Sequence, residues 1–216
     1  MIVKNRNYQK ELDAIIERNE HEGTRPSLLL HVCCAPCSSY VQEYLDDHFD
    51  ITLLFYNPNM DSAAEYDHRS AELLRLIKEA GFSSEPVICE YDPESFDAAA
   101  RGMETEEEGG KRCYRCYELR MRRAACYAAE HNFDYFTTTL SISPYKNAEW
   151  INEIGENLGK EYGVRHLPSD FKKKNGYKRS IELSRQYDLY RQDYCGCVYS
   201  KNSREKKKGP RDEKTA

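Results

Sequence analysis

Short apolar runs, separated by polar stretches, recur along the first two thirds of the chain. Runs of about four to eight residues that are rich in aliphatic, aromatic and β-branched side chains are typical of buried strands. The run SLLLHV is the most compact of them, and it ends directly at Cys33. The sequence therefore predicts strands at 27–32, 51–56, 86–91 and 133–140.

Between these runs the apolar positions follow the helical repeat. Leu12, Ile15 and Ile16 are spaced for one face of a short amphipathic helix at 8–19. The helix that ends at residue 80 is expected to begin after Asp61 or Ser62, because either side chain can cap it, and Gly81 is its stop signal. Asp92 and Pro93 are expected to open another short helix, and further helices are expected at 38–48, 112–130, 147–162 and 180–190.

Strands that alternate with helices of this length predict an α/β fold, with an open, mostly parallel sheet and helices on both faces. Ligands of such sheets bind outside the carboxyl ends of the strands, which is where Cys33 falls. We expect a single domain with a helical C-terminal part. Its segments are an N-terminal helical extension at 1–26, a catalytic α/β domain at 27–200 and a basic tail at 201–216. The tail lacks aromatic and aliphatic residues apart from its final alanine, which predicts disorder.

The composition argues against a membrane protein and against a secreted disulfide scaffold. Hydrophobic residues make up 39% of the 216 and charged residues 32%, and no apolar run approaches the roughly 18 residues that a membrane span needs. The polar, mixed-charge start of the chain does not resemble a secretory signal, so we expect a cytoplasmic protein. Because the cytosol keeps thiols reduced, the nine cysteines predict metal binding or redox catalysis.

The net charge of -5 argues against indiscriminate binding to polyanions, but the basic residues are clustered. Lys172, Lys173 and Lys174 lie close to Lys178 and Arg179, and the tail carries more lysine and arginine. Both clusters are candidate contacts for RNA phosphates. A solvated charged face explains the tail equally well and the lysine run less well.

Seven of the nine cysteines fall into three groups: Cys33, Cys34 and Cys37 in HVCCAPC, Cys113 and Cys116 in RCYRCY, and Cys195 and Cys197 in YCGC. A Cys-x-x-Cys pair places two thiolates within reach of one metal or cluster. A second group far away in sequence can complete the ligand set once a sheet brings strand ends together. Adjacent cysteines suit different irons of one cluster better than a single tetrahedral zinc, because neighbouring side chains diverge. A structural zinc site is the alternative.

Only Gly196 separates Cys195 from Cys197. This spacing is too close for a zinc-finger pair, but glycine permits the strained backbone that a small disulfide ring demands. Strained disulfides are the labile and catalytic ones, so the pair is a candidate redox centre. Two incidental thiols near the C-terminus are the alternative.

Other residues near these groups are better explained by packing. Cys89, on a predicted strand, and Cys126, within a predicted helix, have no spacing partner and are interpreted as core residues. His31 precedes the first cysteine group on a buried strand, where a core histidine is favoured over a neighbour of a cluster. Tyr114 and Tyr117 flank the second cysteine pair and could stack on a base, although packing is the simpler explanation.

Five segments, in this order, make the chain resemble the epoxyqueuosine reductases of the QueH family over residues 27–200. They are HVCCAPCSSYV, FYNPNMDSAAEYDHR, RCYRCYELR, TTTLSISPYKNAEWINEIG and DYCGCVYS. The resemblance implies reductive removal of the epoxide oxygen from epoxyqueuosine in tRNA, which gives queuosine and is the last step of its synthesis. It also implies a fold similar to the nucleotide-binding α/β proteins known as HUP domains.

The same resemblance implies cofactors and partners. The 4Fe–4S cluster of the family is implied at Cys33, Cys34, Cys113 and Cys116, and its redox-active pair at Cys195 and Cys197. The family also has a further iron beside the cluster, for which Cys37 is the nearest candidate ligand by position. We expect tRNA carrying epoxyqueuosine and an external electron donor as partners, and neither a membrane nor DNA.

Two rival functions fit the same cysteines. A cluster-dependent desulfidase or thiolase acting on a thiolated base would need no internal dithiol, which the CGC pair offers. A non-enzymatic zinc module that binds RNA would be colourless when purified, whereas a cluster protein is brown. No flavin or cobalamin motif is visible, so iron and thiols would have to supply the chemistry.

Overall fold

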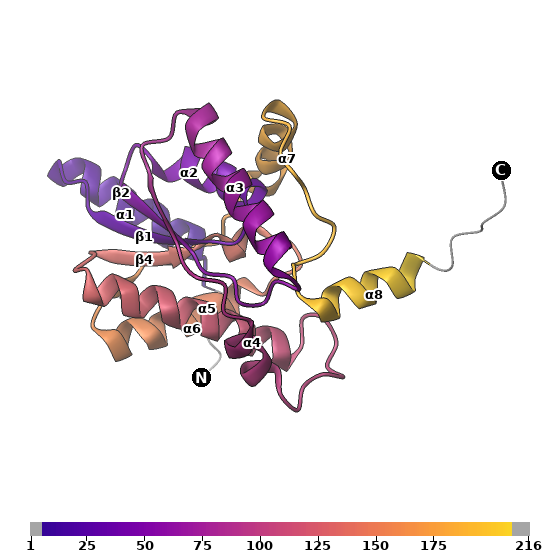
Figure 1. Ribbon diagram of the computed structural model, residues 1–216. Helices are drawn as coiled ribbons and strands as arrows, with labels where there is room; N and C mark the ends of the chain where they lie inside the picture. Colours follow the sequence, from indigo (N-terminus) through magenta and orange to yellow (C-terminus); the bar gives the residue numbers. More distant parts are fainter. Residues whose placement is uncertain (1–5, 209–216) are drawn as a thin grey trace.

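A computed structural model describes residues 6–208, and its centre is a five-stranded, entirely parallel sheet (Figure 1). The strand order β3-β2-β1-β4-β5 is that of a doubly wound sheet, in which strands are added outward in one direction from β1 to β3 and then in the opposite direction from β4 to β5. This confirms the predicted α/β class. The strands are β1 Ser27–Val32, β2 Asp50–Phe55, β3 Glu85–Ile88, β4 Tyr135–Thr138 and β5 Arg165–His166.

Helices cover both faces of the sheet, as expected. In Figure 1, α2, α3 and α7 lie on one side of the strands, and α5 and α6 lie on the other. The helices are α1 Tyr8–Glu22, α2 Ala35–Leu45, α3 Ala63–Ala80, α4 Pro93–Ala100, α5 Lys111–Glu130, α6 Ala148–Tyr162, α7 Gly176–Gln186 and α8 Val198–Lys208, with a short 3-10 helix η1 Thr139–Ile142.

The alternation of side chains along β1 divides the core into two layers. Leu28 and Leu30 pack with α1, α2, α3 and α7 on one face, whereas Leu29 packs with α5 and α6 on the other. Leu12 of α1 is fully buried in the first layer, so the N-terminal helix is part of the core that covers the sheet. Among the described residues, no helix is both long and apolar enough to cross a bilayer.

The start and stop signals in the sequence operate as predicted. Of the two candidate caps for α3, Ser62 is the one that accepts a hydrogen bond, from the Glu65 amide at 3.2 Å. Gly81 ends the helix with φ 70°. Asp92 caps α4 by accepting from the Ser95 amide at 3.2 Å. Local side-chain chemistry therefore sets these boundaries.

Tertiary contacts shift other boundaries away from the predictions. The strand expected at 133–140 ends at Thr138, whose hydroxyl accepts from the Leu140 amide at 3.2 Å and starts η1. Helix α7 was expected at 180–190 but spans Gly176–Gln186. It stops there because Arg75 of α3 donates to the carbonyl of residue 187 at 2.9 Å and to that of residue 188 at 3.2 Å. The two-residue strand β5 is too short to leave a pattern.

The prediction of a disordered tail from residue 201 onward is wrong for residues 201–208, which belong to helix α8. The first turn of α8 is held by a tertiary contact, because the Ser200 hydroxyl donates to Glu108 Oε1 at 3.1 Å. Composition could not reveal this partner, which lies far away in the sequence. Residues 209–216, the rest of the predicted tail, lie outside the described residues.

Candidate metal and redox site

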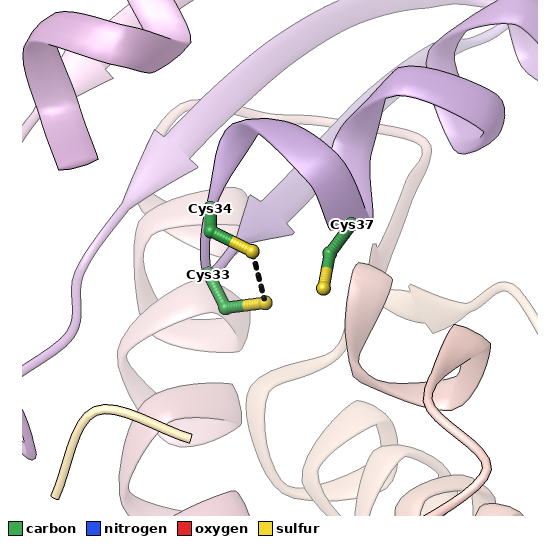
Figure 2. Close-up of side chains that lie close together, drawn as sticks. All are labelled: Cys33, Cys34 and Cys37. Carbon is green, nitrogen blue, oxygen red and sulfur yellow. Dashed lines mark hydrogen bonds between the residues drawn. The ribbon is translucent and has the colours of Figure 1, made fainter. Parts of the chain in front are cut away.

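The first cysteine group lies where β1 passes into α2, at the carboxyl end of the central strand. Cys34 is the N-cap residue of α2, and the first turn of the helix brings Cys37 back over Cys33 and Cys34. Figure 2 shows the Cys33 and Cys34 sulfurs side by side with the Cys37 sulfur facing them, and the three atoms lie within 4.8 Å of one another. The partial positive charge of a helix N-terminus favours thiolates. The group therefore has the spacing and the electrostatic setting of a metal site.

The three thiols share protons. Hydrogen bonds from Cys34 and Cys37 hold the pKa of Cys33 well below its usual range. The same hydrogen bonding to Cys33 raises the pKa of Cys34 to about 12 and raises that of Cys37. The hydrogen bonding thus favours a thiolate at Cys33 over one at Cys34 or Cys37, and a bound cation would favour release of the protons of the other two.

The second group occupies the first turns of α5. Cys113 Sγ accepts a hydrogen bond from the Gly109 amide at 3.2 Å, and Cys116 Sγ accepts one from Arg120 Nη1 at 3.9 Å. Burial raises the pKa of both thiols. The spacing of Cys-x-x-Cys at the start of a helix leaves both sulfurs on the same side of α5.

The third group forms the turn before α8. The Cys195 and Cys197 sulfurs are 3.4 Å apart, and Gly196 between them has φ 108°. The Gly196 carbonyl accepts from the Asp61 amide at 2.9 Å, which fixes the turn against the segment before α3. The hydrogen bond between the two sulfurs, together with the nearby charge of Lys146, lowers the pKa of Cys195 to about 5. The pKa of Cys197 is raised by the same hydrogen bond, so the pair holds one thiolate and one thiol.

Two adjoining cavities bring the three groups together. A cavity of about 250 Å³ is lined by Cys33, Cys34 and Cys37 together with Cys195. A smaller cavity of about 30 Å³ is lined by Cys113, Cys116, Cys195 and Cys197. The residues that line both are Glu108, Tyr145, Lys146 and Cys195. The seven grouped cysteines therefore line two cavities that share a wall, with Cys195 lining both. Among the described residues, Cys33, Cys34 and Cys37 are the group of three whose sulfurs lie within 4.8 Å of one another, and Cys113 and Cys116 are not part of it.

A buried cation that the motif analysis missed lies between these groups. Arg120 is only 2% exposed; its Nη2 donates to Asn57 Oδ1 at 2.9 Å, and its Nε is 3.4 Å from His31 Nε2. Among residues 6–208 it forms no ion pair with a carboxylate. Although burial opposes its charge, the neighbouring Cys116 and Cys33 thiols raise the pKa of Arg120. The available signal was its spacing, because Arg120 follows Cys116 by four residues, one helical turn.

Lys146 is the second residue that was missed. It is half-buried in the wall between the two cavities, on the loop that joins η1 to α6. Burial lowers its pKa, but the thiols of Cys33, Cys37 and Cys195 outweigh that effect and raise it. No local pattern marks this lysine, because every thiol that it faces is distant in sequence.

Four of the five residues interpreted as packing have that role in the structure, and the expectation of a core position for Cys126 is wrong. His31 is fully buried; its Nδ1 lies 2.7 Å from Thr138 Oγ1 and its Nε2 lies 3.1 Å from the carbonyl of residue 56. Tyr114 packs against a tryptophan ring, and Tyr117 is 4% exposed. Cys89 packs against the α5 side of the core, but Cys126 is a partly buried surface residue of α5 that donates to a glutamate.

The predicted RNA-contacting lysines lie away from both cavities, before α7. Lys172 pairs with Asp170 at 2.6 Å, and Lys174 pairs with Asp13 at 2.8 Å. Lys173 is exposed. Two of the three charges are thus already partly neutralised by carboxylates, which weakens the attraction of this run for phosphate.

The family model and the curated relatives that match this chain carry one family name. The family model described as "Epoxyqueuosine reductase QueH" matches residues 28–203. A protein of that name from Streptococcus pyogenes serotype M1 is 43% identical over 198 residues, covering 90% of this chain and 78% of its own length. One from Staphylococcus epidermidis is 44% identical over 200 residues, covering 90% of this chain and 84% of its own length. One from Thermotoga maritima is 34% identical over 187 residues, covering 84% of this chain and 93% of its own length. Among solved structures, NMN synthetase from Francisella tularensis aligns with a TM-score of 0.46 at 14% identity, covering 88% of this chain and 75% of its own.

Proposed function

The chain belongs to the epoxyqueuosine reductase QueH family, and from this we propose that it is an oxidoreductase that converts epoxyqueuosine in tRNA to queuosine. The observation that carries the proposal is that three cysteine groups line two adjoining cavities near the carboxyl end of β1. That position is where doubly wound sheets bind their ligands. Family membership and the internal dithiol favour the reductase over a desulfidase and over a zinc module that binds RNA.

We propose that Cys33, Cys34, Cys113 and Cys116 hold a 4Fe–4S cluster, with Cys37 nearest to an additional iron. Two observations support the fit: the sulfurs of Cys33, Cys34 and Cys37 lie within 4.8 Å of one another, and Arg120 is a buried cation without a carboxylate partner among residues 6–208. A cluster held by four thiolates carries net negative charge, which would balance Arg120. When bound, such a cluster with an adjacent iron supplies single electrons and a Lewis-acidic metal.

The dithiol can supply the electron pair of the net reaction. An epoxide, one thiol, one thiolate and one further proton give an alkene, a disulfide and water, so that both C–O bonds break, one S–S bond forms, and the oxygen leaves with the thiol proton and the further proton. Cys195 is the sulfur held as thiolate, and Cys197 keeps its proton. Lys146, on the wall of both cavities, can donate a proton from Nζ to the departing oxygen. An external electron donor would then reduce the disulfide for the next turnover.

Binding of the tRNA requires contacts outside the cavity. We propose that Lys172, Lys173 and Lys174 and the basic α8 contribute phosphate contacts, with affinity that falls as salt rises. The expected compartment is the cytoplasm, and no contact with a membrane or with DNA is proposed.

The test is anaerobic purification followed by iron and sulfide analysis and an assay with tRNA carrying epoxyqueuosine. We expect a brown protein whose product nucleoside has lost one oxygen. In Cys195→Ser the cluster should remain while multiple turnover stops. A colourless zinc protein, or an iron protein that leaves the epoxide intact, would show the proposal to be wrong.

A further inference from the structure

Three arginine–tyrosine pairs surround the cavity above the first cysteine group. In each, the guanidinium lies over the ring: Arg69 over Tyr194 at 5.3 Å, Arg191 over Tyr177 at 5.5 Å, and Arg204 over Tyr145 at 5.3 Å. All of these residues line the cavity. A wall of this composition offers flat ring surfaces and positive charge together.

Two of the arginines are occupied by protein partners. Arg69 is 2% exposed and pairs with Glu65 at 2.6 Å. Arg191 donates from Nη1 to Ser184 Oγ at 3.2 Å. Their contacts fix the segment between α7 and the Cys195–Cys197 turn, so these two pairs are structural.

The pair formed by Arg204 and Tyr145 differs. Arg204 Nε is buried and has no hydrogen-bond partner among the described residues, although a buried donor is unfavourable when it is unpaired. Tyr145 is 66% exposed and lines both cavities, so its ring is accessible beside Cys195. Figure 1 shows α8, which carries Arg204, projecting from the body of the molecule beside the start of α5. An unpaired donor and an accessible ring therefore face the same cavity.

The charge and size of the cavity indicate its occupant. Its lining carries the cations Arg69, Lys146, Arg191 and Arg204 against the carboxylates Glu108 and Asp193. A volume of about 250 Å³ suits a single nucleoside and not a folded RNA loop. Enzymes that act on a base take it out of the stack into such a pocket, and proteins that read single-stranded RNA stack bases on aromatic rings.

We propose that Tyr145 and Arg204 clamp the reacting nucleotide. The Tyr145 ring stacks on the base, Arg204 Nε donates to the adjoining phosphate, and α8 forms one wall of the substrate cavity. This inference rests on the proposed function for its RNA substrate and assigns the residues that position it. Both are positioning residues, because neither is placed at the breaking C–O bonds.

The test compares two tRNA stem-loops bound by the cluster-loaded protein, one with guanosine and one with an abasic site at the target position. The wild type should bind the guanosine stem-loop more tightly. Tyr145→Ala should lose that preference, with affinity for the guanosine stem-loop falling about 10-fold or more, because one base stack is lost. Tyr145→Phe keeps the ring and should keep the preference.

Arg204 is tested against Lys206, an exposed cation on the same helix. Arg204→Ala should weaken both stem-loops equally, by clearly more than Lys206→Ala does, because only Arg204 lines the cavity. With epoxyqueuosine tRNA both clamp variants should raise KM and leave kcat and iron content unchanged. An unaltered base preference in Tyr145→Ala, or equal losses in the Arg204 and Lys206 variants, would overturn the clamp. The binding test does not depend on the reaction, because guanosine is not reduced. If the wild type shows the base preference in the binding test but does not reduce epoxyqueuosine tRNA, the proposed function is refuted and the clamp is not.

Discussion

The geometry of the Cys195–Cys197 pair depends on Gly196, so Gly196→Ala tests whether this turn supplies the electrons. Gly196 has φ 108°, a left-handed conformation that residues with a Cβ rarely adopt. An added Cβ would also lie 3.3 Å from Arg69 Nη1, and Arg69 is held by its ion pair with Glu65. The variant must therefore either keep a strained turn or open it.

The expected cost follows from the backbone conformation. A residue with a side chain in such a sparsely populated region costs about 1–3 kcal/mol, and a central value of about 2 kcal/mol corresponds to roughly 30-fold in an equilibrium constant. If the turn persists, the free energy of unfolding falls by that amount. If the turn opens, the two sulfurs separate, and the equilibrium constant for forming the Cys195–Cys197 disulfide falls by up to that factor.

The assay equilibrates the protein with buffers of defined dithiol to disulfide ratio and measures the oxidised fraction of the pair, alongside turnover with substrate tRNA. We expect lower turnover and less disulfide at each ratio in Gly196→Ala, with iron content unchanged. Gly23→Ala is the matched control, because Gly23 also has a left-handed backbone, at φ 63°, but closes α1 with no other atom within 4 Å of an added Cβ. It should lose stability and keep the disulfide equilibrium.

The reasoning about the turn would be refuted by a Gly196→Ala protein with the disulfide equilibrium, turnover and stability of the wild type. A loss of stability alone, with both redox measurements intact, would show that the pair tolerates the strained turn and that its geometry does not limit the reaction.

Further predictions concern the cluster and the pH dependence of stability. Cys113→Ala should abolish visible absorbance and reductase activity together. Cys126→Ala, on the same helix but outside both cavities, is the control and should keep both. Normal iron content in Cys113→Ala would contradict the ligand assignment. Arg120→Met should speed loss of iron to a chelator, because the guanidinium that donates to Cys116 Sγ is removed, and Arg120→Lys should restore part of the difference; equal rates in all three proteins would contradict this role. Burial, aided by the charge of Arg6, lowers the pKa of His166 from 6.5 to about 3, so the unfolded chain takes up the proton first and stability falls as pH drops below 6.5. From pH 8 to pH 5.5 this group lowers the free energy of unfolding of the wild type by about 1.4 kcal/mol. Chemical unfolding of His166→Leu should therefore show a fall over this range that is smaller by that amount. Parallel pH curves for the two proteins would contradict the assignment.

Much of the fold could be predicted from the sequence because its signals are local. The apolar run at 27–32 coincides with β1, and the caps Ser62 and Asp92 start α3 and α4 where expected. The failures lie where distant residues decide. Arg75 of α3 ends α7 early, and Glu108 holds the first turn of α8 in a segment whose composition predicts disorder.

The sequence by itself determined which residues carry the chemistry: three cysteine groups, their spacing and the order of motifs that marks the family. Only the tertiary structure decided how they meet. The strand order brings the ends of β1 and β4 together, so that Lys146 and the buried Arg120 both lie near the Cys33 thiol, which is far from them in sequence. The physical reason is that spacing encodes contacts within a helical turn or a strand, whereas burial and charge compensation depend on side chains that approach one another only when the sheet is assembled.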